Sequence, residues 1–226
     1  MKLQFSWKYL LAFVPLLFIM GETHELAHTS VGRFICGCWG QRDFNVWGLC
    51  KGCKDTYPLL SILATFAGPL YSFIWVWIGY FLLGKNRSNT SKIWGISIIG
   101  ANILFARILT SLLFSGDEVY GMRRLTDSFY LSWILGLTIV LCLSIPPLVR
   151  VYRTLANEKK NLWFIGFLMV PFITVLVIGI SLNTALKNGI WNEYWILGSP
   201  KIITYWLFLM LVLFIINRKK INLLIK

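Results

Sequence analysis

The sequence has little charge. Asp, Glu, Lys and Arg together make up 14% of its 226 residues, against roughly 25% in average soluble domains, while 57% of the residues are apolar. A soluble globule of this length could not bury so many apolar side chains. The composition excludes a disordered chain, a fibrous repeat and a secreted disulfide scaffold. It predicts an all-α integral membrane protein folded as one compact bundle.

Acidic residues are scarcer than basic ones. The chain has 22 Lys and Arg but only 9 Asp and Glu, for a net charge of +13. In a soluble protein this balance would favour a nucleic-acid partner. In a membrane protein the basic residues belong in the loops, next to anionic lipid headgroups. We therefore expect the lipid bilayer, and not nucleic acid, to be the partner of these charges.

Long apolar runs define the membrane segments. Spanning the hydrocarbon core as a helix takes about 20 mostly apolar residues, and six stretches qualify, separated by polar or basic segments. We predict six transmembrane helices, with a short β-hairpin-like loop between the first two. The predicted spans are Tyr9–Phe34, Pro58–Leu83, Ile93–Phe114, Phe129–Val149, Leu162–Leu182 and Ile202–Ile216.

The basic residues also predict an orientation. The amino terminus, the second and fourth loops and the tail ending at Lys226 carry more Lys and Arg than the opposite side. The positive-inside rule then places both termini in the cytoplasm, for a multi-pass protein of the cell membrane. No small-residue cleavage site follows the first apolar run, so we expect that run to be retained and not removed as a signal peptide.

The two histidines of the chain stand four residues apart, in His24-Glu25-Leu26-Ala27-His28. Residues four apart on a helix share one face, so both imidazoles can bind one Zn²⁺, and Glu25 can act as general base towards a water there. Chance produces this HExxH pattern on the order of 2 times in 10,000. Such side chains are also costly inside a bilayer, which marks them as functional. We predict His24 and His28 as zinc ligands and Glu25 as the catalytic residue.

A catalytic zinc site takes three protein ligands, and the chain has no third histidine. The first and third predicted helices run in the same direction, so the third ends on the side of the membrane where the histidines lie. Gly116 can let the backbone turn a carboxylate inward there. We predict Asp117 as the third ligand, with Glu118 as the alternative. Solvation of both carboxylates at a loop start is the competing interpretation.

These residues resemble the site-2 protease family of intramembrane zinc metalloproteases. Its members carry HExxH in one transmembrane helix, a Gly-Pro-x-x-Asn element in a following helix and an aspartate, often in Asp-Gly, in a later one. The segment Ala67-Gly68-Pro69-Leu70-Tyr71-Ser72 is similar to the second element, with Ser72 in the usual place of Asn. Gly116-Asp117-Glu118 stands where the third belongs, with Glu118 in the usual place of Gly.

The resemblance covers about Gly21 to Glu118, and it implies a protease. Residues 1–128 would form a metalloprotease-like transmembrane core, and residues 129–226 would add three helices to the same bundle. The implied activity is cleavage of a membrane protein substrate in or near a transmembrane segment, for regulated proteolysis or for processing. The implied cofactor is Zn²⁺.

Further positions are candidates to bind substrate or shape the site. Gly68 permits a close helix approach, and Pro69 frees a backbone carbonyl that can bind an extended substrate strand; a kink without function is the alternative.

Asn102, the nearest candidate for the asparagine of the family, lies 15 residues before Asp117, about 22 Å along a continuous helix. Both can line one site only if the helix breaks. Arg107, a charge inside the third span, needs a partner there, as a structural cation or as a substrate contact.

Cysteines are few, and four of the five gather in the first loop. The two doublets can form disulfides in an oxidising compartment, bind a structural metal or remain free thiols, and an external loop favours the disulfides. Flanking glycines support a tight hairpin. The clustered residues are Cys36, Cys38, Cys50 and Cys53, and the fifth, Cys142, is expected to pack in the core.

Two other functions compete with proteolysis. One is a catalytically silent or accessory multi-pass membrane protein with a structural metal site, which the substitution at Ser72 leaves open. The other is a metal transporter. A transporter would spread several intramembrane histidines or carboxylates along a path, whereas this sequence holds a single cluster.

Overall fold

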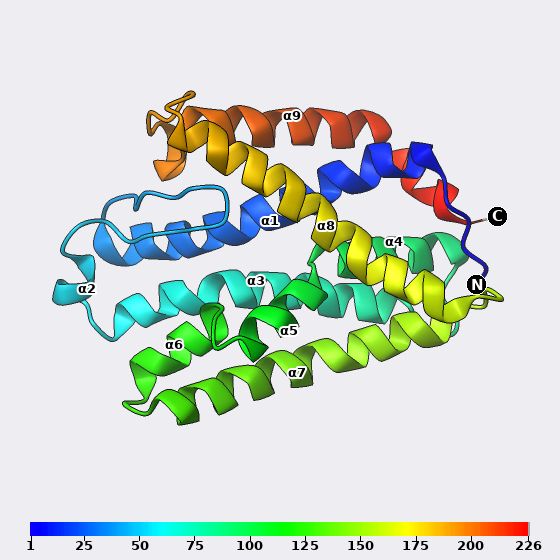
Figure 1. Cartoon of the computed structure of the whole chain (residues 1–226), viewed down its shortest axis with the longest axis horizontal. Helices are drawn as coiled ribbons and strands as arrows, with labels where there is room; N and C mark the ends of the chain where they lie inside the picture. The colour runs from blue at the N-terminus through cyan, green and yellow to red at the C-terminus, as the bar shows by residue number, and fades with distance from the viewer. Residues whose placement is uncertain (226) are drawn as a thin grey trace.

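In the computed structural model, which describes residues 1–225, the chain forms an elongated bundle of helices (Figure 1). Lys226, one of the basic residues of the tail, lies outside the described residues. Helix accounts for 75% of the chain. The elements are α1 (Trp7–Cys36), α2 (Cys53–Thr56), α3 (Leu60–Leu82), α4 (Asn89–Ala101), α5 (Leu104–Leu112), α6 (Asp117–Leu125), α7 (Phe129–Thr154), α8 (Lys160–Lys187), η1 (Ile196–Gly198), α9 (Lys201–Asn217) and η2 (Arg218–Leu224).

The six predicted apolar helices are confirmed, because six helices are long and apolar enough to cross a membrane. Their ends follow local sequence. Ser88 and Ser128 cap α4 and α7 by accepting a hydrogen bond from a backbone N–H of the first turn, which satisfies a donor that the helix itself leaves unpaired. Both termini lie at one end of the bundle (Figure 1), as an even number of crossings requires.

The third span is broken, not continuous. It consists of α4 and α5, and the two are separated by Asn102 and Ile103. Ile103 has a φ of 47°, which is a left-handed conformation that an α-helix of L-residues cannot propagate. The chain therefore changes direction there, and this break was the condition for Asn102 and Asp117 to serve one site.

The β-hairpin predicted between the first two spans is wrong. Residues 37–52 contain no strand and form only one antiparallel bridge, between Arg42 and Trp47. Glycine is disfavoured in strands, and four glycines interrupt this loop. The loop instead folds back along α1 (Figure 1), where side-chain contacts hold it.

Of the three states open to the clustered cysteines, the structure has two disulfides, Cys36–Cys53 and Cys38–Cys50. They tie the end of α1 to α2 and close the base of the loop. The core placement expected for Cys142 is wrong, because its side chain is exposed on α7. In an apolar bundle the outer surface is a normal place for a small apolar thiol, since lipid surrounds it.

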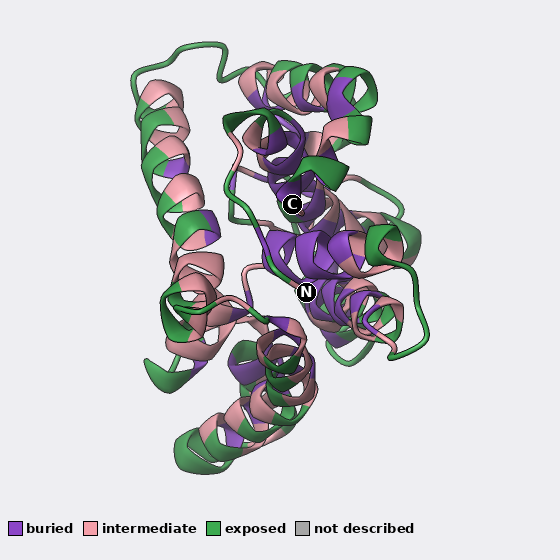
Figure 2. Ribbon diagram, turned by 90° about the vertical axis from the view of Figure 1, so that its right-hand side faces the viewer, coloured by how far each residue is buried: buried purple, intermediate pink, exposed green. Residues whose placement is uncertain are grey.

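The interior is formed mainly by α1, α3 and α4. Buried residues gather there, while the peripheral helices are mostly half-buried or exposed (Figure 2). α1 packs against α3, α4 and α9. The predicted histidine helix is therefore the central helix of the bundle, and its buried polar residues, Glu22, His24, Glu25, His28 and Thr29, face protein.

Candidate metal centre

α1 directs His24 and His28 towards α3. The His24 side chain is 9% exposed and that of His28 is fully buried. Gly68 of α3 makes room for both rings. A Cβ at that position would collide with Nε2 of His28 and would lie 2.7 Å from Cε1 of His24. The close helix approach expected of Gly68 is confirmed, and its purpose is to admit the two imidazoles.

A hydrogen bond fixes the tautomer of His28. Its Nδ1 lies 2.7 Å from the carbonyl oxygen of Ala64 on α3, and because a carbonyl only accepts, Nδ1 carries the proton. Nε2 of His28 therefore keeps a lone pair that points to His24. Metal-binding histidines are typically oriented in this way by a partner on the other ring nitrogen.

Asp117 completes a group of three ligand atoms. Nε2 of His24 lies 3.1 Å from Nε2 of His28, and Oδ2 of Asp117 lies 3.3 Å from the first and 3.4 Å from the second. In a tetrahedral zinc site with ligands at about 2.0–2.1 Å, neighbouring ligand atoms are about 3.3–3.4 Å apart. Two imidazoles and a carboxylate are a ligand set of catalytic zinc. The residues therefore fit a zinc ion in both spacing and chemistry.

The chain turn before Asp117 decides which carboxylate faces the histidines. Gly116 has a φ of 96°, as the predicted turn requires, and α6 starts immediately after it. Burial raises the pKa of the Asp117 carboxyl, but contacts with the two imidazoles lower it by more, and the pKa lies below its usual range. The group is thus a carboxylate, the form that binds metals.

The alternative ligand, Glu118, points elsewhere. Its Oε1 accepts a hydrogen bond of 2.8 Å from Nη1 of Arg107, and its side chain is 2% exposed. The partner expected for Arg107 is therefore present. The ion pair links α5 to α6 and so helps to place Asp117.

Two groups compete for Nδ1 of His24. Oγ of Ser72 lies 3.0 Å away and can accept its proton, which leaves Nε2 with a lone pair for a metal. Nη2 of Arg107 lies 2.8 Å from the same nitrogen and can only donate. Ser72 can thus orient His24 by accepting the proton of Nδ1. Arg107 approaches the same nitrogen as a donor, so its position determines whether the bond between Ser72 and His24 forms.

Glu25 lines a cavity of about 190 Å³ beside the histidines. Within residues 1–225 its Oε2 is buried and has no hydrogen-bond partner. Leaving a buried acceptor unpaired is costly, which is typical of a group kept for a ligand. His24, Asn102 and Arg107 line the same cavity, so the break of the third span does bring Asn102 to the site.

Sequence reasoning missed Trp47. Its indole stacks on the His28 ring, with centroids 4.4 Å apart and planes 7° apart. Its Nε1–H donates to Oδ1 of Asp117 at 3.2 Å. Trp47 thereby covers the His28 ring and orients the Asp117 carboxylate, two of the predicted ligands. Nothing local distinguishes it from the other ten tryptophans of the chain, because its role comes from the folding of the loop.

An ion pair buried beneath the loop was also missed. Nη1 of Arg42 donates to Oε2 of Glu22 at 2.7 Å, and Nε donates to Oγ of Ser199 at 2.6 Å. The side chains of Arg42 and Glu22 are 2% and 1% exposed. The pair fastens the loop to α1, one turn from Glu25, and to the connection before α9. The loop that carries Trp47 is thus held at its base by disulfides and in its middle by Arg42.

Comparison of the chain with protein-family models, with curated proteins and with solved structures finds no match. A functional assignment therefore rests on the chemistry of the site.

Proposed function

We propose that the chain is an intramembrane zinc endopeptidase, similar to the site-2 protease family, that cleaves a membrane protein in or near a transmembrane segment. One observation carries the proposal. The ligand atoms of His24, His28 and Asp117 lie 3.1–3.4 Å apart inside a membrane-type bundle, next to Glu25. A zinc ion bound there supplies Lewis acidity, which polarises a carbonyl and lowers the pKa of water to about 7.

The residues of the chain have separate roles in this proposal. His24, His28 and Asp117 hold the ion. Glu25 accepts a proton from the water whose oxygen attacks the peptide carbonyl, and it then gives that proton to the amine as the C–N bond breaks. The unpartnered Oε2 of Glu25 faces protein and not lipid, which supports this role.

The substrate has to present an extended peptide bond. In a helix the carbonyls are already hydrogen-bonded, and in lipid they cannot exchange partners with water. The cavity beside Glu25 is lined by α1, by the break at Asn102 and Ile103, and by Val175 of α8. We infer that an unwound substrate segment enters between α5 and α8. Backbone groups at the break and near Pro69 lie outside the regular hydrogen bonding of the helices, so they can bind an extended substrate strand.

The proposed location is the cell membrane, with both termini in the cytoplasm. Both termini lie at one end of the bundle, and the loop of residues 37–52 lies at the other (Figure 1). The two disulfides at the base of this loop support an oxidising compartment on that side. The excess of basic residues at the end that holds the termini points the same way.

The direct test is Glu25→Gln, expressed with the wild type in matched membranes. New amino termini inside transmembrane segments are identified by mass spectrometry of terminal peptides, and zinc is measured in both proteins. We expect the variant to keep its zinc and to lose the new termini. Glu193→Gln, which changes an exposed carboxylate that does not line the cavity of Glu25, is the control. A zinc-loaded Glu25→Gln protein that yields the same termini at the same rate would falsify the proposal.

A catalytically silent protein with a structural metal is the second candidate. The observation that favours it is Trp47, which stacks on His28 and bonds to Asp117, and so closes one side of the triad. A hydroxamate, which binds zinc only at an open coordination position, separates the two. Binding to the zinc-loaded protein supports the protease, and absence of binding supports the structural role.

A further inference from the structure

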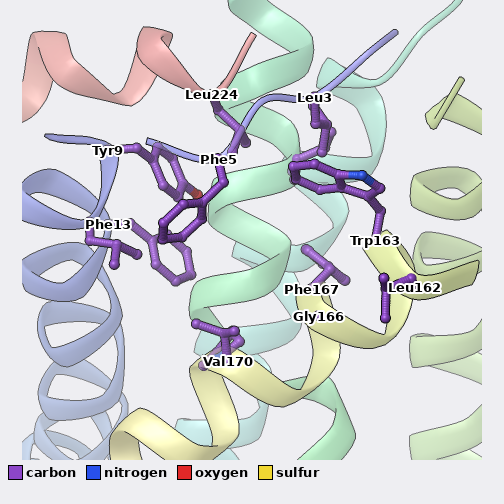
Figure 3. Close-up of a pocket in the computed structure, with 13 residues that line it drawn as sticks. Leu3, Phe5, Tyr9, Phe13, Leu162, Trp163, Gly166, Phe167, Val170 and Leu224 are labelled. Carbon is purple, nitrogen blue, oxygen red and sulfur yellow. The ribbon is translucent and has the colours of Figure 1, made fainter. Parts of the chain in front are cut away.

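The other end of the bundle has an apolar cavity of about 310 Å³. It lies between the amino-terminal segment, α1, α8 and the end of the chain (Figure 3). Phe5, Phe13, Phe167 and Leu224 are among its walls. Ligand sites measure about 300–1,000 Å³ and are lined mainly by apolar and aromatic side chains. This cavity has the size and the lining of such a site, and it is separate from the histidine cluster.

A polar hollow of about 460 Å³ adjoins this cavity. Leu3, Phe5 and Trp163 line both, and Lys2 and Lys159 line the polar part alone. Figure 3 shows Trp163 and Leu3 together at the upper end of the apolar cavity. One space therefore runs from an apolar interior, past an indole, to two lysines.

We propose that this space binds one anionic glycerophospholipid, with an acyl chain in the apolar cavity and the phosphate at Lys2 and Lys159. Two of the helices that line the cavity, α1 and α8, begin at this end, at Trp7 and Lys160. This is the depth at which a membrane-spanning helix leaves the hydrocarbon. Bilayer lipids have their headgroups there, and interfacial tryptophans such as Trp163 mark the same level.

Charge selects the headgroup. Both lysines at the mouth are exposed, and Lys160 lies 4.2 Å from the centre of the Tyr152 ring nearby. Glu158 is the one acidic residue among those lining the polar hollow. Basic residues next to a membrane surface attract anionic lipid. An anionic headgroup is therefore favoured over a zwitterionic one.

Gly166 offers a way to fill the cavity. It lines the cavity from α8, and a Cβ added there would meet no atom within 4 Å. The Cβ of Gly166→Phe therefore has open space, and its ring should occupy the space of the acyl chain. Ile165→Phe is the matched control, because Ile165 is the preceding residue of α8, is 55% exposed and is not part of the cavity.

The experiment titrates phosphatidylglycerol or phosphatidylcholine into the purified full chain in detergent, and native mass spectrometry counts the bound lipids. We expect one phosphatidylglycerol to bind roughly 10-fold more tightly than phosphatidylcholine. Gly166→Phe should lose this first binding event and Ile165→Phe should keep it. The double variant Lys2→Ala/Lys159→Ala should bind both lipids equally.

Equal binding of the two lipids to the wild type overturns the proposal, and so does unchanged binding to Gly166→Phe. Because Lys2 and Lys159 are exposed, their double variant should fold and tests the proposal even where Gly166→Phe does not fold. The outcome is independent of zinc binding and of proteolysis, since none of these residues contacts the histidine cluster.

Discussion

The first three membrane-spanning helices and the last three use apolar sequence in opposite ways. α8 is the most apolar of the six by mean hydropathy, yet only 11% of its most apolar part is buried inside the protein, while the broken span of α4 and α5 is 56% buried. In water the most apolar helix would be the most buried. Here lipid is the solvent, so an apolar helix gains little by moving inward. Polar residues, and not apolar ones, therefore identify the interior.

The interior of the first half accordingly contains buried pairs of opposite charge among its apolar side chains. Arg42 pairs with Glu22, and Arg107 pairs with Glu118. The second half offers an exposed pair, Lys201 with Glu193. If this comparison is correct, substitutions in the first half should have large effects, and matched substitutions in the second half should have small ones.

The largest expected effect is that of His28→Ala. It removes a proposed zinc ligand whose lone pair is fixed by Ala64, so zinc measured by elemental analysis should fall from near one per chain to near zero. Ser181→Ala, at an exposed position of α8, should leave the zinc content unchanged. Equal losses in the two variants would show that zinc content reports folding and not ligation.

Arg42→Ala should follow. It leaves Glu22 buried without its partner, and breaking such a pair costs about 3–5 kcal/mol. The measurement is the unfolding midpoint in detergent, which should fall steeply. Lys201→Ala, which breaks the exposed pair with Glu193, should move the midpoint little, because water already solvates that pair. Similar shifts would contradict the contrast between the two halves.

Gly68→Ala tests the close approach of α3 to the histidines. A Cβ there meets both imidazoles, and overpacking of this kind costs about 1–3 kcal/mol. Both the unfolding midpoint and the zinc affinity should decrease. Gly166→Ala on α8, where a Cβ meets open space, should be neutral or slightly stabilising. A neutral Gly68→Ala would mean that α3 lies farther from α1 than the structure has it.

Trp47→Phe should have the smallest effect of the four. Phe can keep the stacking on His28, but it cannot donate to Oδ1 of Asp117. Loss of a hydrogen bond to a metal ligand typically lowers affinity 10- to 100-fold, and we expect about 10-fold, measured by competition with a chelator. Trp195→Phe, on the exposed connection before α9, is the control. An unchanged zinc affinity would remove Trp47 from the site.

The predictable parts of the molecule are those encoded locally. Apolar length alone gives the six spans, and a spacing of four brings His24 and His28 to one face. Topology then selects the end of the third span, where Gly116 turns Asp117 towards them. The need to pair a charge in lipid correctly implied a partner for Arg107.

The unpredicted parts depend on contacts between distant segments. Arg42 is one of several basic residues of the first loop in the sequence, but it reaches Glu22, 20 residues away, and Ser199, 157 residues away. Trp47 meets Asp117 across 70 residues. The loop lacks strands because disulfides and these side chains hold it, and no periodicity in residues 37–52 carries that information.

The central claim is that zinc is bound by His24, His28 and Asp117. X-ray absorption at the zinc edge of the purified wild-type protein tests it most directly. We predict about one zinc per chain, with two imidazole nitrogens and carboxylate oxygen at about 2.0–2.2 Å and no sulfur. Sulfur ligands at about 2.3 Å would place the metal at cysteines, and that result, or a protein that takes up no zinc, would contradict the account.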